Sequence, residues 1–563
     1  MGVINWNRIE GNYMKKRLFL KCLALFLCGA FLVTIVGCSS QGSDKILSYS
    51  LTADPKNLDP QTANGADALL IIDNIFEGLY RKDAQGNLVL GAASSCEINE
   101  DGTEYRFVLP SDVTWKYYAP GNAVSEDQTI TAKVTAHDFV YAFERLFDPQ
   151  TNAPSASDYY CIKNAQAVKE GKLPPSELGV QALDDYTLMF TLSAPNPLFE
   201  ELLAEPAAKP CNQEFFEGTT GRYGLSRETL LCNGPFYVSE WSNANDNDYV
   251  RIRKNDLYHD PDSVVSAGAN LTVRSNDAAI ASFEKGDIDS ISLSADDYQM
   301  IKGTKYPTTA YQNTVVGILL NPTEEHFAND NIRKAFAMDI NRDDFASTLT
   351  EDQLPAAAIV PPSVKLDGVP YREQAGDSLA PAYNPEQARS LLEQGMAQLK
   401  KVNKNVSDLN SLTLLAPEEA ALPVQKILQT WQKDLGVYMK TEILPQDEYQ
   451  QRLKSGDYSC AVVTVSSSKD SPASILEQFE TNSSSGYSCG LSSYDNALNQ
   501  ASKQTQLSEV TNAYLQAESL LLNSGGFIPI YYQQSYFITQ NNIDGLFFDN
   551  ANERLYFQNA RKK

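Results

Sequence analysis

Residues 53–80 read ADPKNLDPQTANGADALLIIDNIFEGLY and form the first of several segments that have no catalytic motif but a highly specific sequence. Seven more follow in order: VTAHDFVYAFERLFDPQTNAPSAS (134–157), LGVQALDDYTLMFTLSAPNPLFEELL (178–203), CNGPFYVSEW (232–241), VRIRKNDLYHD (250–260), FEKGDIDS (283–290), LNPTEEHFANDNIRKAFAMDINRDDF (320–345) and GFIPIYYQQSYFIT (526–539). One such segment would say little. Eight in a fixed order, over residues 46–540, indicate one particular fold.

In that order, the eight segments closely resemble the oligopeptide-binding proteins of bacterial ABC importers, the family-5 extracellular solute-binding proteins. The resemblance implies an α/β protein with a type II periplasmic-binding-protein fold, in which two lobes with an extra subdomain surround a hinged ligand cleft. It implies that lobe 1 comprises residues 46–90, 204–300 and 525–563. It also implies that residues 91–203 form the subdomain of lobe 1 and that residues 301–524 form lobe 2.

Local hydrophobic patterns agree with a mixed α/β chain. Alternation of apolar and polar residues, typical of half-buried strands, occurs at 47–51, 105–109 and 186–192. Apolar residues recur at helical spacing from Leu507 to Leu521, which predicts a helix with one apolar face. Another helix is expected after Asp330, a plausible N-cap. The Ser-rich segments 465–474 and 481–493 are expected to be loops.

The amino terminus has the pattern of an export signal. Basic residues at 15–17 precede an apolar run, Leu18–Gly37, that is long enough to cross a bilayer. The run ends at Ile35-Val36-Gly37-Cys38, which looks like the lipobox of bacterial lipoproteins, in which the cysteine is acylated. We therefore expect residues 1–37 to be a signal peptide, Cys38 to be lipidated and residues 38–45 to be a flexible tether. Met14 is a plausible true start, and an uncleaved anchor is the alternative.

Composition limits the possible partners. The formal net charge of −25 argues against binding to nucleic acid or anionic lipid. Beyond the amino-terminal run, no second apolar run approaches spanning length. Six cysteines remain outside the signal and lipobox, and an exported compartment permits disulfides but leaves their pairing open, with free buried thiols as the alternative. These cysteines are Cys96, Cys161, Cys211, Cys232, Cys460 and Cys489.

Catalytic and metal-binding signals are sparse. The chain has three histidines, His137, His259 and His326, which lie more than sixty residues apart. No H-E-x-x-H and no phosphate-binding loop occurs, and no pair of cysteines has C-x-x-C spacing. We therefore expect a protein that is not an enzyme and that holds no metal or cofactor.

The resemblance also bears on the ligand site. Peptide-binding members often carry a stretch similar to G-W-x-A-D-Y-x-x-P, whose Asp meets the peptide α-amine. Here the matching segment is TVSSSKDSP (464–472), with Ser468 at the Asp position and Asp470 as a possible substitute or an ordinary loop acid. Losing a charge-assisted hydrogen bond would cost about 1.5–3 kcal/mol, which puts the exact ligand in doubt. The implied ligand-facing residues are Asn64, Gly65, Asp158, Tyr159, Ser468 and Asp470.

Together these features predict the substrate-binding component of an ABC importer. It would be held by lipid on the outer face of the cytoplasmic membrane, would bind oligopeptides as a monomer, and would work with a permease and its ATPase subunits. Two alternatives are a peptide sensor that acts without transport and a binder of a non-peptide solute.

Overall fold

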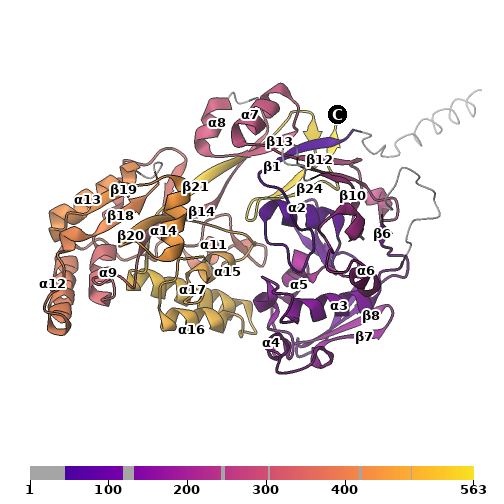
Figure 1. Ribbon diagram of the computed structural model, residues 1–563, viewed down its shortest axis with the longest axis horizontal. Coiled ribbons are helices and arrows are strands. Elements are labelled where there is room, and N and C mark those ends of the chain that lie inside the picture. The colour runs from indigo at the N-terminus through magenta and orange to yellow at the C-terminus, as the bar shows by residue number, and fades with distance from the viewer. Residues whose placement is uncertain (1–44, 118–131, 243–247, 302–304, 418–420, 484) are drawn as a thin grey trace, which may run out of the picture.

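The computed structural model describes residues 45–117, 132–242, 248–301, 305–417, 421–483 and 485–563. Two lobes lie side by side, and the chain passes from lobe 1 to lobe 2 and back again (Figure 1). The carboxyl-terminal strands return to lobe 1, where they lie near the first strand of the chain. Residues distant in sequence therefore meet in lobe 1.

An 11-stranded sheet runs through both lobes in the order β10-β11-β12-β1-β13-β21-β14-β20-β18-β19, with β15 paired to β21. Lobe 1 holds β10 (Phe236–Ser242), β11 (Tyr249–Lys254), β12 (Gly268–Val273), β1 (Leu47–Leu51) and β13 (Ser290–Leu293). Lobe 2 holds β20 (Cys460–Ser466), β18 (Thr413–Ala416), β19 (Lys440–Ile443) and β15 (Gln353–Pro355). The sheet is therefore a physical link between the lobes.

Two long antiparallel strands, β14 (Thr308–Leu320) and β21 (Phe527–Thr539), make this link. The last residues of β21 pair with β13 on one side and with the first residues of β14 on the other, whereas the rest of β14 pairs with both β21 and β20. The β14–β21 register shifts between Tyr311 and Thr314, opposite 533–535. We infer that the strands pass between the lobes near this irregularity, and the lobe boundaries expected from sequence at 301 and 525 stay predictions.

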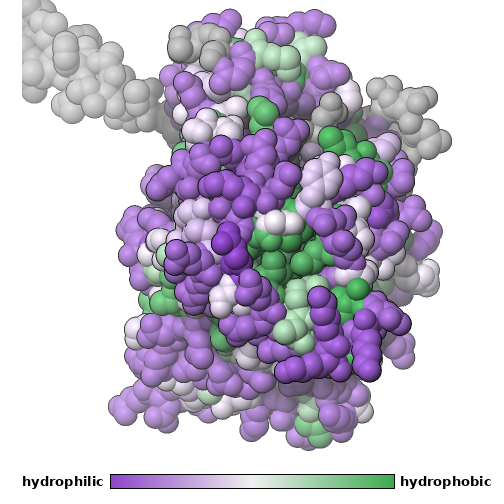
Figure 2. Space-filling model, turned by 90° about the vertical axis from the view of Figure 1, so that its left-hand side faces the viewer, coloured by the Kyte–Doolittle hydropathy of each residue, from purple (hydrophilic) through white to green (hydrophobic). Residues whose placement is uncertain are grey.

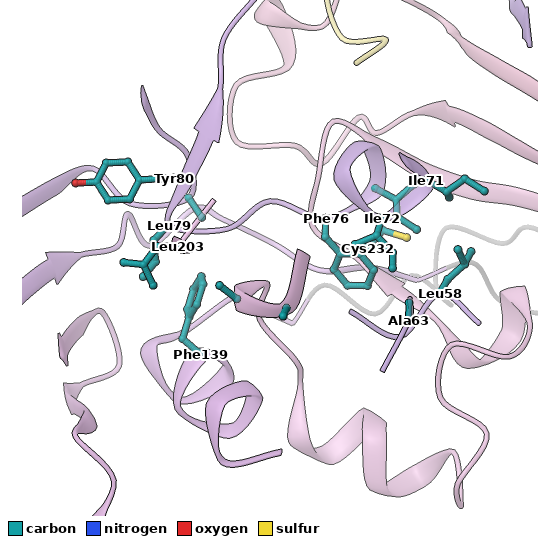
Figure 3. Packing of buried hydrophobic residues seen from close by; sticks show 14 of the residues in the cluster. Leu58, Ala63, Ile71, Ile72, Phe76, Leu79, Tyr80, Phe139, Leu203 and Cys232 are labelled. Carbon is teal, nitrogen blue, oxygen red and sulfur yellow. The ribbon is translucent and has the colours of Figure 1, made fainter. Parts of the chain in front are cut away.

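Three large apolar clusters fill the lobes. One occupies lobe 1 and includes Leu58, Ile72, Phe76 and Phe139, which Figure 3 shows around α2 (Ala66–Ile75) and α3 (Ala136–Phe147). The other two lie on opposite faces of the lobe 2 sheet, because neighbouring residues of β14 alternate between them. One face is covered by α11 (Tyr371–Ala375), α15 (Ala473–Leu476), α16 (Ser492–Ala501) and α17 (Leu507–Ser524), and the other by α9 (Asp330–Met338), α12 (Pro385–Val402) and α13 (Ala421–Leu435).

A separate four-stranded antiparallel sheet lies next to lobe 1, with strand order β4-β5-β8-β7. Its strands are β4 (Ser95–Ile98), β5 (Glu104–Val108), β7 (Val180–Asp184) and β8 (Thr187–Thr191). Helix α3 packs on this sheet through an edge-to-face contact between Phe143 and Phe190, whose ring centroids lie 5.1 Å apart. Phe143 also meets Tyr159 edge to face, with 5.6 Å between the ring centroids. We call this unit, residues 95–191, the subdomain.

Shorter elements complete the structure. The remaining helices are α4 (Ala165–Lys169), α5 (Phe199–Leu202), α6 (Gln213–Gly218), α7 (Asn276–Lys285), α8 (Ala295–Ile301), α10 (Arg342–Ala346) and α14 (Gln446–Ser455). The remaining strands are β2 (Tyr80–Lys82), β3 (Leu88–Leu90), β6 (Lys116–Tyr117), β9 (Leu231–Cys232), β16 (Lys365–Leu366), β17 (Val369–Pro370), β22 (Ile543–Asp544), β23 (Phe547–Asp549), β24 (Arg554–Tyr556) and β25 (Arg561–Lys562).

The local expectations from sequence are largely confirmed. The three alternating segments correspond to β1, β5 and β8, and the apolar stripe after Leu507 is α17. The N-cap of α9 is Asn329, so the expectation of Asp330 was wrong by one residue; Asp330 is already helical and pairs with Arg333. The expected loops are also too long, because β20 continues to Ser466, α15 begins at Ala473 and α16 begins at Ser492.

The expected lipidation site Cys38, the expected signal peptide and nearly all of the expected tether lie outside the described residues. Within them, no helix has the length and apolar character needed to cross a bilayer. The six cysteines at issue are free thiols in the structure. The end face of lobe 2 is mainly hydrophilic around a central hydrophobic patch (Figure 2).

Candidate functional site

A cavity of about 210 Å³ lies where lobe 1, the subdomain and lobe 2 meet. We call it the interlobe cavity. Lobe 1 and its carboxyl-terminal segment contribute Pro60, Ala63, Asn64, Leu69, Glu205, Pro206, Ala207 and Arg554; the subdomain contributes Pro154, Ser155, Asp158 and Tyr159; lobe 2 contributes Ser468 and Lys469. A ligand in this space would touch both lobes.

The lobe 2 wall is the turn that follows β20. The backbone N–H of Ser467 donates to the Asn313 carbonyl of the hinge strand β14, at 2.9 Å, and its hydroxyl donates to the Lys469 carbonyl, at 2.5 Å. Ser474 donates to the same carbonyl, at 3.2 Å. Both serines are buried, so their hydroxyls stabilise a turn that leaves Ser468 exposed to the cavity.

Lys469 reaches from this turn across the cavity to the subdomain. Its ammonium forms an ion pair with the carboxylate of Asp158, with side-chain exposures of 26% and 11%. Burial alone would lower the pKa of Lys469, but Asp158, Glu477 and Glu205 together outweigh it and hold the pKa above its ordinary value. Lys469 is therefore a cation that joins lobe 2 to the subdomain.

Arg554, on β24, supplies the second cation of the wall. Its guanidinium is almost buried and donates to Glu205 at 2.9 Å and to Asp73 at 3.0 Å. It also lies 3.5 Å from the Ser468 carbonyl of lobe 2. Although burial opposes ionisation of Glu205, Arg554 holds the pKa of this carboxyl below its ordinary value. The pair is thus ionised and internally compensated.

Asp470 points away from the interlobe cavity. One of its oxygens accepts the backbone N–H of Lys365, at 2.9 Å, and the other lies 3.4 Å from the ammonium of Lys82, in lobe 1. Lys82 pairs as well with Asp549. Asp470 therefore forms a second ionic link between the lobes and does not line the cavity.

Two glutamates near these links have strongly raised pKa values. Burial, reinforced by Asp470, raises the pKa of Glu201 to about 7. Burial, reinforced by Asp158, raises the pKa of Glu477 to about 7. Each therefore changes charge near neutral pH at the surface where the lobes meet.

The structure brings four of the six residues inferred from sequence to the interlobe cavity: Asn64, Asp158, Tyr159 and Ser468. Gly65 lines a neighbouring cavity of about 240 Å³, which shares Ala63 and Asn64 with the first. The Tyr159 ring is buried and its hydroxyl donates to the Leu202 carbonyl, at 2.9 Å, so it supports the wall. Contact of these residues with a ligand stays a prediction.

Sequence reasoning missed Lys469, Arg554, Glu205, Glu201 and Glu477. Lys469 and Glu201 lie in segments compared with the family but have no assigned role there, and Arg554 lies beyond the last segment that carried the resemblance. Only the ionic contacts formed on folding identify them.

Nothing in the interlobe cavity resembles a catalytic or metal centre. Its lining includes neither cysteine nor histidine. In the part of the chain that the structure describes, no group of three or more His, Cys, Asp or Glu side chains could hold a metal ion. The histidines lie elsewhere, with His137 beside Asp185, His259 beside Glu77 and His326 beside Glu324.

Comparison with known families identifies this architecture. The model of the bacterial extracellular solute-binding proteins, family 5 (middle), matches residues 87–487. The chain belongs to this family. The family-5 chain folds as the resemblance implied, as a mixed α/β protein of the periplasmic-binding type.

Relatives of this family-5 chain match nearly its whole length. It is 27% identical over 509 residues to the dipeptide-binding protein DppE of Bacillus subtilis, covering 89% of each chain. It is 26% identical to the oligopeptide-binding protein OppA of the same organism, covering 97% of this chain and 99% of the relative. The structure of Listeria monocytogenes OppA bound to peptide matches with a TM-score of 0.70 and 25% identity, covering 92% and 99% of the two chains.

Proposed function

We propose that this protein is the lipid-anchored, extracytoplasmic substrate-binding component of an ABC importer, which captures oligopeptides by lobe closure and delivers them to the permease. The observation that carries the proposal is the interlobe cavity, whose wall combines Asn64 of lobe 1, Asp158 of the subdomain and Ser468 of lobe 2. The names of the relatives, which bind dipeptides or oligopeptides, support peptides as the ligand.

Capture works through the shared strands. A ligand favours the closed arrangement only if it binds that arrangement more tightly, which requires contacts with both lobes. The register shift between Tyr311 and Thr314 supplies a point at which β14 and β21 can bend while staying paired on either side. Backbone hydrogen bonds to an extended peptide would then provide affinity with little dependence on sequence.

Isothermal titration of the purified protein with a mixture of tri- to heptapeptides tests the peptide proposal. We expect a heat of binding and a rise in the thermal unfolding midpoint, because a ligand that binds only the folded state stabilises it. Absence of both signals would exclude peptides and favour a non-peptide solute. The chain itself would act as a binder, with no enzymatic activity.

Anchoring through Cys38 would keep the binder close to its permease and so raise its effective concentration there. Cys38→Ala should release the protein from the membrane fraction or leave its signal uncleaved, and Cys96→Ala should change neither. A Cys38→Ala protein that is processed and retained normally would contradict lipid anchoring. Neighbouring permease and ATPase genes would favour import, whereas their absence would favour the alternative of a peptide sensor.

A further inference from the structure

The four charged residues that line the interlobe cavity form two internal pairs. Lys469 pairs with Asp158, and Arg554 pairs with Glu205. The wall therefore has two positive and two negative side chains and no net charge. Asp73, behind the wall, is compensated by Arg554 and by Lys209, whose ammonium lies 3.7 Å away.

These pairs are poorly accessible to a competing charge. The exposed fractions of the four side chains are 6% for Arg554, 11% for Asp158, 21% for Glu205 and 26% for Lys469. A charged ligand group would need either to break one of these pairs or to enter the cavity without a counter-ion. Both are unfavourable, since an unpaired charge that leaves water loses several kcal/mol of hydration.

The polar groups that remain open are neutral. Asn64 of lobe 1 and Ser468 of lobe 2 are exposed, line the cavity from opposite sides, and make no side-chain hydrogen bond to any residue the structure describes. An amide and a hydroxyl can each donate and accept. Both groups suit an uncharged polar partner.

We infer that the interlobe cavity binds an uncharged, hydrogen-bonding end of the ligand, such as an acylated amine or a carboxamide, with Asn64 and Ser468 as the residues that determine this preference. The inference rests on the proposed function, since it specifies which peptides the protein takes. The cavity adjoins a second one at Ala63 and Asn64, so a ligand whose end lies in the interlobe cavity can continue beyond it. Both peptide termini are ionised in water at neutral pH, which makes chemical blocking the decisive variable.

Four tetrapeptide pools with the same uncharged side chains test this inference by isothermal titration of the full-length protein. One pool has free termini, one is acetylated, one is amidated and one is blocked at both ends. We expect at least one blocked pool to bind tenfold or more tightly than the free pool. If the free pool binds as tightly as every blocked pool, the inference is overturned while peptide binding stands. If no pool binds, the proposed function itself is overturned.

A charge variant tests the named residue. Ser468→Asp gives the wall one net negative charge, so it should change the ratio of blocked-pool to free-pool affinity by tenfold or more. Ser508→Asp is the matched control, because Ser508 is exposed in the first turn of α17, away from the cavity, where an added carboxylate is favourable. If neither Ser468→Asp nor Ser508→Asp changes the ratio of blocked-pool to free-pool affinity, Ser468 does not contact the ligand and the inference is overturned.

Discussion

Lys469 of lobe 2 forms an ion pair with Asp158 of the subdomain across the interlobe cavity. Lys82 of lobe 1 meets Asp470 of lobe 2 in the same way, at 3.4 Å. The two sides of the cleft are thus joined by the chain's own charges. These two ion pairs stabilise the arrangement of the lobes that the structure shows.

Lys469→Ala should shift the empty protein toward the open arrangement. A partly exposed ion pair is worth about 1 kcal/mol, so the ratio of closed to open molecules should fall about fivefold. Small-angle X-ray scattering would report a larger radius of gyration. The control is Lys433→Ala, which removes an ammonium that is 77% exposed and pairs within lobe 2 at 3.6 Å. Identical scattering curves for both variants would argue against Lys469 as an interlobe contact.

Closure should depend on pH through Glu201 and Glu477. Their pKa values of about 7 arise from burial and neighbouring acids at the interface, whereas a solvated glutamate has its ordinary value of 4.5. The closed form therefore binds more protons between these values, and closure weakens as the pH rises through this window, with the loss complete above about pH 7.

Several charged groups surround the carboxyls of Glu201 and Glu477 and affect their pKa values. Asp470, Asp367, Lys82 and Glu205 act on Glu201. Asp158, Lys469 and Glu480 act on Glu477. Scattering from the empty protein at pH 5 and pH 8 should show a larger radius at pH 8, and the double variant Glu201→Gln, Glu477→Gln should reduce the difference. A difference that persists fully in the double variant would assign it to other groups.

Asp339 should destabilise lobe 2 at high pH. Its side chain is fully buried, neither oxygen has a hydrogen-bond partner in the described part of the chain, and burial together with Asp434 raises its pKa to about 7. Because the folded protein binds this proton more tightly than the unfolded chain, stability falls as the pH rises toward 7. Asp339→Asn should raise the unfolding free energy at both pH values, by about 1–3 kcal/mol more at pH 8 than at pH 5.

Urea unfolding at the two pH values measures this effect. Asp457→Asn is the control, since its carboxylate is 76% exposed and surface ion pairs contribute little. An equal gain at pH 5 and pH 8 would mean that ionisation of Asp339 is not the cause.

Glu518 should be essential for lobe 2 stability. This fully buried carboxylate of α17 accepts the backbone N–H groups of Ile359, at 2.6 Å, and Val360, at 3.0 Å, and pairs with Arg372 at 2.6 Å. Glu518→Gln leaves the buried guanidinium without its counter-charge, which costs about 3–5 kcal/mol. Thermal unfolding would measure the loss, and Glu509→Gln, exposed on the same helix, should change stability by less than about 0.5 kcal/mol.

Sequence predicted most of the fold because strands and amphipathic helices leave a local periodicity. β1, β5, β8 and α17 were each visible as such a pattern. The place where the chain passes between the lobes was not visible in the sequence, because it lies inside two strands. β14 and β21 continue through it, and only the register of their pairing shifts after Tyr311. Pairing joins residues more than two hundred positions apart and leaves no local mark.

From the sequence, residues of the candidate site could be proposed where a single position matches a position with a role in the family. Asn64 and Ser468 were found this way, as they stand where relatives are expected to face the ligand. Arg554, Glu205 and Lys469 were not, since their importance depends on which charges meet after folding. Asp470 was proposed from the sequence as a ligand-facing residue, but in the structure it does not line the cavity. Its contact with Lys82 shows that it joins the lobes, and this contact is formed only on folding.

The interlobe cavity takes its earliest wall residues from 60–69 and its last, Arg554, from β24, close to the carboxyl terminus. A chain that is synthesised amino end first therefore has an incomplete cavity wall until residue 554 has been added. Contacts of such long sequence separation form slowly. A variant that stopped before β24 would keep both strands that link the lobes but would lack the arginine of this wall.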